Sequence, residues 1–132
     1  MAVEDDIRSH LLASVSAASG RTFCGLMRDP SSLYPDRAIS VLQTGGAAPN
    51  GFMDGMGTDY RRCRFQVRVR SDVGDYEGGR TLSESIWQAL QRATLTTGYV
   101  RCYVVNSEPL FWGRDDKDHY EWSVNGVAEK EE

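Results

Sequence analysis

Residues 62–70, in the middle of the chain, alternate strictly between polar and apolar side chains, and this pattern constrains the fold more than any other. The segment reads Arg-Cys-Arg-Phe-Gln-Val-Arg-Val-Arg. A period of two is that of a β-strand, whose successive side chains point to opposite faces of a sheet. One face of this strand must therefore belong to a hydrophobic core. The other face carries four guanidinium groups, those of Arg62, Arg64, Arg68 and Arg70.

Two segments have helical periodicity. Residues 3–18 place apolar side chains along one face and three acidic residues in the first turn, where carboxylates complement the helix dipole. Residues 76–93 repeat the pattern, and Asp75 stands where a helix N-cap is expected. Gly78 and Gly79 weaken the first turn of that helix or permit close approach of another backbone. The sequence thus predicts two amphipathic helices.

Further strands are predicted around the second helix, at residues 38–42, 99–105, 110–113 and 119–127. Strands joined by short turns pair antiparallel, and apolar helix faces pack on a sheet. The chain has 132 residues, which suits one domain. We therefore expect an α+β fold over residues 1–132, with a mostly antiparallel sheet and two helices packed on one of its faces.

Two segments are expected to be irregular. Residues 44–59 contain five glycines and a proline, which predicts a long flexible loop. This loop carries Phe52, Met53 and Met56, and either a partner or the domain itself could bury these apolar side chains. The C-terminal residues 128–132 are expected to be a frayed tail.

Composition excludes several classes of function. A net charge of −4 disfavours binding to nucleic acid through phosphate neutralisation. Thirteen of the 15 cationic residues are arginine, which is typical of protein interfaces but is equally explained by a GC-rich genome. No apolar run approaches the roughly 20 residues that span a bilayer. The acidic N-terminus does not read as a signal peptide, so we expect synthesis and assembly in a cytoplasm.

No motif indicates catalysis or metal binding. The three cysteines lie far apart and without CxxC spacing, and His10 and His119 are also distant from one another. The glycine-rich loop lacks the lysine of a phosphate-binding loop, and neither GxSxG nor HExxH occurs. The acidic group at 115–121 lacks the spacing of a calcium loop. We predict a protein without catalytic, cofactor or metal sites, and not an enzyme.

Three motifs in a fixed order resemble a known family. Leu42-Gln-Thr-Gly-Gly precedes the glycine-rich loop, and Phe65-Gln-Val-Arg-Val-Arg precedes a helix that ends in Ile86-Trp-x-x-Leu90. The last motif runs from Pro109-Leu-Phe-x-Gly-Arg-Asp to Tyr120-x-x-Ser123-x-Asn125. Over residues 3–127 the chain is similar to the small tail terminator proteins of tailed bacteriophages, also called tail completion or minor capsid proteins.

The resemblance implies a structural virion protein that is assembled in the host bacterial cytoplasm. Such a protein forms a homohexameric ring that caps the head-proximal end of the tail tube and stops its polymerisation. The ring joins the tail to the neck or connector and leaves a channel for DNA, without specific DNA binding, a cofactor or turnover. An acidic net charge suits a channel through which DNA slides.

A closed ring needs two unlike patches that meet head to tail. The strand at 62–70 is strongly positive, whereas Glu4 to Asp6 and residues 115–121 are negative, so opposed charges could fix the register between copies. A solvated outer sheet face is the alternative interpretation of the arginines. The predicted interaction residues are Arg62, Arg64, Arg68, Arg70, Phe52, Met53, Met56, Asp115 and Asp116.

Three other functions compete with this interpretation. A head-completion or stopper protein of the neck would share the ring but bind the portal side. A small enzyme or ligand-binding α+β domain would need convergent polar groups, and no such cluster is evident. A nucleic-acid-binding module would need aromatic residues among the arginines, but Phe65 lies on the opposite face of the strand.

Overall fold

The computed structural model describes residues 3–15, 22–25, 37–46, 50–51, 59–91, 93, 95, 99–115 and 118–131. Within these ranges it has two helices and seven strands. Their order is α1 (Val3–Ser14), β1 (Thr22–Cys24), β2 (Ala38–Gly46), β3 (Asn50–Gly51), β4 (Asp59–Arg70), α2 (Tyr76–Leu90), β5 (Tyr99–Val104), β6 (Leu110–Arg114) and β7 (Tyr120–Glu131).

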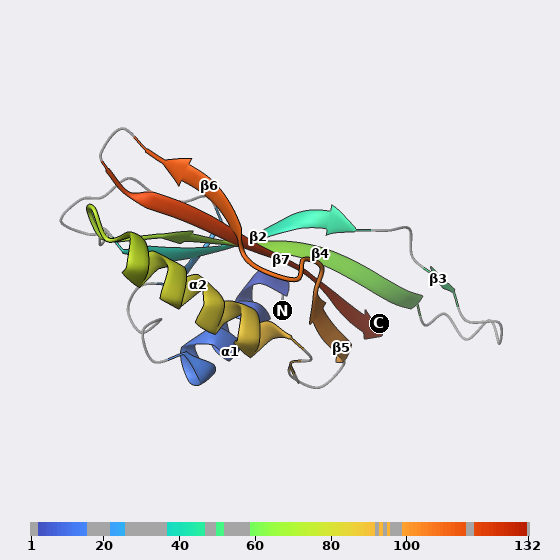
Figure 1. Cartoon of the computed structure of the whole chain (residues 1–132). Helices are drawn as coiled ribbons and strands as arrows, with labels where there is room; N and C mark the ends of the chain where they lie inside the picture. The colour runs from blue at the N-terminus through green and yellow to red at the C-terminus, as the bar shows by residue number, and fades with distance from the viewer. Residues whose placement is uncertain are drawn as a thin grey trace.

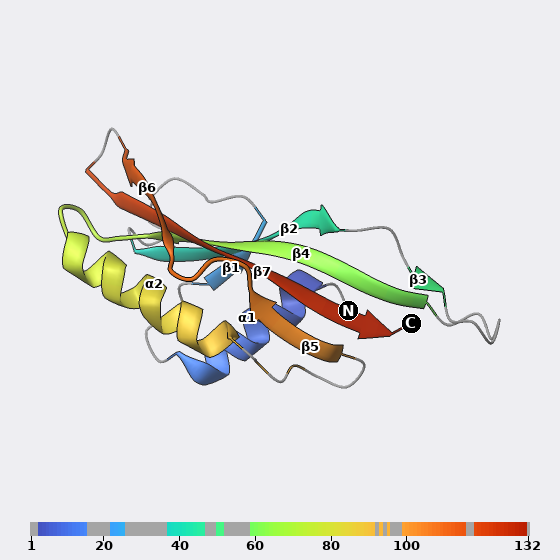
Figure 2. The same cartoon turned by 45° about the vertical axis from the view of Figure 1, so that its right-hand side comes forward.

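The strands form one sheet in the order β1-β2-β4-β7-β5, to which β3 adds beside β4 and β6 beside β7. Every pair is antiparallel except β1 with β2. The long strands β4 and β7 form its centre, paired from Tyr60 opposite Glu131 to Arg70 opposite Glu121. Both helices lie against the same face of this sheet (Figures 1 and 2). The predicted α+β fold is confirmed.

The core lies between that face and the helices. As the alternation predicts, Cys63, Phe65, Val67 and Val69 of β4 are buried. The residues packed with them come from both helices and from β7: Ile7, Leu11, Leu82, Ile86, Leu90, Trp122, Val124 and Ala128. Because each of these side chains removes apolar surface from water, this layer supplies most of the hydrophobic stabilisation of the fold.

The start of α2 sits unusually close to the sheet. The Asp75 carboxylate accepts a hydrogen bond from the backbone N–H of Gly78 at 2.9 Å, which confirms the predicted N-cap. A Cβ atom at Gly79 would lie 2.3 Å from the ring of Trp122 in β7. Gly79 therefore permits the close approach that the paired glycines suggested.

Both segments expected to be irregular are more ordered than predicted. Thr44–Gly46 continues β2, residues 50–51 form β3 and Asp59 begins β4, so strands replace part of the loop expected over 44–59. The prediction of a frayed tail at 128–132 is wrong up to residue 131. β7 runs to Glu131, because β4 pairs with one edge of it and β5 with the other.

Other boundaries differ by a few residues. α1 ends at Ser14 and α2 at Leu90, each earlier than the apolar period suggested. β1 was not predicted, since three residues are too few to show a period. The remaining residues of the loop, 47–49 and 52–58, lie outside the described ranges. Neither described helix has the length and apolar character needed to cross a membrane.

Candidate protein-interaction surface

The face of the sheet opposite the helices is called the outer face here. It carries Arg62, Arg64, Gln66 and Arg68 of β4 together with Glu121, Ser123, Asn125, Val127 and Glu129 of β7. Arg101 and Tyr103 of β5 extend it at one end, and Leu110 of β6 extends it at the other. No described helix packs on this face (Figure 1). Three of the four predicted arginine residues therefore lie on the side of the sheet that no described helix covers.

A buried carboxylate holds two of the outer-face arginines. Glu129 is fully buried, and its carboxylate lies between the guanidinium groups of Arg62 and Arg101. Arg62 Nε lies 3.3 Å from Glu129 Oε1, and Arg101 donates to both carboxylate oxygens. The ring of Tyr103 lies 4.9 Å below the Arg101 guanidinium. The charge of Arg62, a predicted interaction residue, is thus largely satisfied within the chain.

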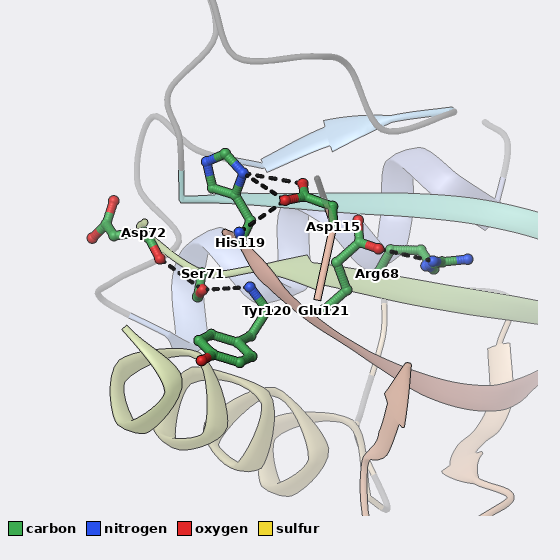
Figure 3. Close-up of polar contacts among 7 residues, drawn as sticks. All are labelled: Arg68, Ser71, Asp72, Asp115, His119, Tyr120 and Glu121. Atoms are coloured by element: carbon green, nitrogen blue, oxygen red, sulfur yellow. Dashed lines mark hydrogen bonds and ion pairs between the residues drawn. The ribbon is translucent and has the colours of Figure 1, made fainter. Parts of the chain in front are cut away.

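Arg68 also contacts side chains of its own chain. Its guanidinium pairs with the Glu121 carboxylate (Figure 3) at 3.9 Å. It also lies 5.0 Å from the ring centre of Trp112. The indole N–H of Trp112 donates to Ser123 Oγ at 2.6 Å. Trp112 is nevertheless about half exposed, so Arg68 and this indole form a cation–π platform open to solvent on the outer face.

The last arginine of β4 is not on the accessible surface. Arg70 is only 3% exposed, so it does not present the outward guanidinium that alternation predicts. It stands at the end of β4, in register with Ala38 of β2 and Glu121 of β7, so strands flank it on both sides. Ser71 follows it and ties β4 to β7, because its hydroxyl accepts from the Tyr120 N–H at 2.9 Å (Figure 3).

Asp115, another predicted interaction residue, organises the turn between β6 and β7. Its carboxylate accepts from the backbone N–H of His119 at 2.8 Å and lies 3.0 Å from Nδ1 of that ring (Figure 3). His119 itself is buried. The geometry gives Asp115 a role inside the chain. Of the other predicted residues, Phe52, Met53, Met56 and Asp116 lie outside the described ranges.

The acidic first turn of α1 also has partners within the chain. Asp6 is buried and accepts a hydrogen bond from the Tyr99 hydroxyl, at 2.5 Å. Burial, followed by this hydrogen bond, raises the pKa of Tyr99. Glu4 accepts from the backbone N–H of Gln43 at 3.2 Å. Through Asp6 and Glu4 this turn anchors α1 to the sheet, whereas Asp5 is exposed.

Arg64 differs from its neighbours because it forms no ion pair with any described residue. Its register partners are Gly45 of β2 and Val127 of β7, and neither carries a charge. Arg64 is exposed at the rim of a hollow of about 660 Å³. Tyr103, Val105, Leu110 and Val127 supply the apolar part of its wall, and Asn106 and Asn125 the polar part.

The sequence reasoning missed an exposed apolar segment beside this hollow. Val105, Leu110, Phe111 and Trp112 are all 40–60% exposed. β6 pairs only with β7, so among the described strands its second edge is open. The available signal was the run Leu-Phe-Trp, which does not alternate as a half-buried strand should. Open apolar edges are prone to pair with another chain, so this edge is a candidate interface.

On its other face, β6 closes the end of the core. Phe111 and Tyr76 lie edge to face at 5.7 Å between ring centres. Trp122 lies within 5.2 Å of both rings, at 5.1 Å from Phe111 and 5.2 Å from Tyr76. The exposed part of Phe111 is therefore the rim of an intramolecular aromatic cluster. The outer-face side of β6, with Leu110 and Trp112, is the part that faces a potential partner.

Comparison with known proteins identifies the family. The family model described as bacteriophage tail terminator protein matches residues 15–132. This chain belongs to that family. It is accordingly a structural protein of phage tails. No curated protein matches its sequence.

A solved structure has the same fold. This chain superposes on a chain of the virion of a native gene transfer agent particle with a TM-score of 0.69 and 13% sequence identity. The match covers 99% of this chain and 96% of the other chain. Among the described residues, no three His, Cys, Asp or Glu side chains gather where they could hold a metal ion.

Proposed function

We propose that this protein forms a homohexameric ring at the head-proximal end of a phage tail tube. In this role it stops polymerisation of the tube protein and presents its other face to the neck or connector. DNA passes through the central channel without specific binding. The observation that carries the proposal is the match of the tail terminator family over residues 15–132.

The surface of the chain supports an assembly role. In a ring, one patch of each copy meets a different patch of the next copy. The exposed side chains of Val105, Leu110 and Trp112 and the open edge of β6 provide apolar surface of the kind that protein interfaces bury. Arg64 adds a cation that forms no ion pair with any described residue.

The first experiment is light scattering coupled to size-exclusion chromatography over a concentration series, with negative-stain images of the largest species. We expect a closed ring of six copies with a central hole. The purified protein is then added to polymerising tube protein of the same phage, and we expect shorter tubes with a ring at one end. Tubes of unchanged length and without bound protein would contradict the capping role.

A further inference from the structure

Arg64 contrasts with the other arginines of the outer face. Arg62 and Arg101 share Glu129, and Arg68 lies beside Glu121. Arg64 stands between Gly45 and Val127 in the register and has no carboxylate within reach among the described residues. A solvated guanidinium at the rim of an apolar hollow is well placed to pair with an incoming carboxylate.

Two of the polar side chains of the hollow are paired within the chain. The Gln66 amide donates to Asn125 Oδ1 at 3.0 Å, and Asn125 Nδ2 donates to Asn106 Oδ1 at 3.3 Å. Much of the remaining wall is apolar, with Val105 and Leu110 both exposed. A carboxylate of an occupant can therefore pair with Arg64 at the rim of these apolar walls.

The same chain carries carboxylates of the required kind. Glu84 of α2 and Glu108 of the β5–β6 connection are both exposed, and neither forms an ion pair with a described residue. They line one shallow depression of about 380 Å³ with Arg80, Thr81, Ser85 and Gln88, and the guanidinium of Arg80 pairs with Glu77. The molecule thus has an unpaired cation at one hollow and unpaired anions at another, which is the arrangement that a head-to-tail contact requires.

We propose that the outer-face hollow receives the α2 side of a second copy of this chain, with Arg64 pairing with Glu84 and Glu108 of that copy. This contact rests on the proposed function, since it is the joint between neighbouring subunits of the ring. It gives each copy one donor surface and one acceptor surface. Repetition of the contact generates a ring or a filament according to the angle between the two surfaces.

The test uses two charge-reversed variants of the full chain, Arg64→Glu and the double variant Glu84→Arg with Glu108→Arg. Each variant alone opposes like charges across the contact. We expect the concentration for half-assembly to rise roughly 30-fold or more in each. An equimolar mixture of the two variants restores opposite charges at every joint, so we expect it to assemble like the wild type, with alternating copies.

The matched control is Arg114→Glu, which reverses an exposed charge outside the two hollows. It should assemble as the wild type does. Thermal unfolding of every variant checks that the fold is intact. If both charge-reversed variants form the ring at the same concentrations as the wild type, this inference is wrong, but the proposed ring is not contradicted. If the reversals spare the ring and abolish tube binding, the occupant is the tube protein and the inference is again wrong.

If the wild type forms no ring in solution, a pair of introduced cysteines tests the proposed contact. In a Cys24→Ser background, which removes the exposed native thiol, Arg64→Cys and Glu84→Cys are combined and oxidised at high concentration. The control is Arg114→Cys/Glu77→Cys in the same background. Disulfide-linked multimers that are absent from this control would support the contact even though no ring forms in solution. Absence of multimers beyond that control would overturn the inference.

Discussion

On the helix side of β4, Cys63, Phe65, Val67 and Val69 lie in an apolar layer closed by α1 and α2. On the other side of the same strand, arginines alternate with them, and each differs in what its neighbours provide. The helix side is stabilised by the burial of apolar side chains, which depends on their volume and not on the direction of individual contacts. The outer face is held by pairs of charges, which depend on the identity of the residue opposite.

The contrast extends to residues only two positions apart. Arg62 faces Glu129 across the strand pair, whereas Arg64 faces Val127. Arg62 therefore forms an ion pair within the chain, whereas the charge of Arg64 stays available for a partner. A sheet face of this kind can therefore combine stability and assembly in one strand. The predictions below compare the two faces directly.

The largest expected effect is on the helix side. Ile86 is fully buried between α2 and the sheet, so Ile86→Ala should lower the free energy of unfolding by about 3 kcal/mol through lost burial and the cavity left behind. Leu110→Ala on the outer face should lower it by less than about 0.5 kcal/mol, because Leu110 is 40% exposed. Urea denaturation measures both. Equal losses would show that the outer face is as tightly packed as the core.

The next effect lies within the outer face itself. Glu129→Gln removes the buried carboxylate between two guanidiniums and should cost about 2 kcal/mol of unfolding free energy, discounted because both arginines are partly exposed. Arg64→Gln should change it by less than about 0.5 kcal/mol, since Arg64 has no described partner. The comparison of thermal midpoints tests the division between paired and unpaired arginines. A loss at Arg64 as large as that at Glu129 would contradict it.

The smallest effect is a dependence on pH. Burial on the helix side raises the pKa of Cys102 from 9.0 to about 12. The unfolded thiol ionises first, so the stability that the neutral buried thiol provides is complete below pH 9 and is lost between pH 9 and about 12. At pH 10.5 we expect a loss of about 1–2 kcal/mol relative to pH 8.

Urea midpoints at the two pH values measure this loss, and Cys102→Ala isolates it. Cys24 and Tyr99 also have raised pKa values and contribute in the same direction. The variant should therefore lose less stability than the wild type between pH 8 and 10.5. If the two proteins lost the same free energy of unfolding between pH 8 and 10.5, ionisation of Cys102 would not be the cause of the loss.

Much of the fold was predictable because its signals are local. Strict alternation at 62–70 identified the central strand and its buried face, and helical periodicity with Asp75 as the cap identified α2. The length of β7 was not predictable in this way. Glu129-Lys130-Glu131 reads as a solvated tail, and only strands on both sides make it part of the sheet.

The candidate surface was predictable in outline only. Alternation placed Arg62, Arg64 and Arg68 on one face, but it could not distinguish among them. The exposed side chains of β6 were missed because a five-residue strand with a bulge shows no clear period. The intramolecular partners of Asp6 and Asp115 were not predictable for a related reason, since Tyr99 and His119 are brought to them by folding or by a turn.

The sequence by itself determined which residues form the core, the helix start at Asp75 and the family to which the chain belongs. These depend on periods, caps and ordered motifs that span a few residues each. Only the tertiary structure decided which charges are neutralised, because Coulomb attraction and hydrogen bonding act over a few ångströms between residues far apart in the chain. The register of β4 against β2 and β7 buries Arg70, pairs Arg62 with Glu129 and leaves Arg64 unpaired on the outer face.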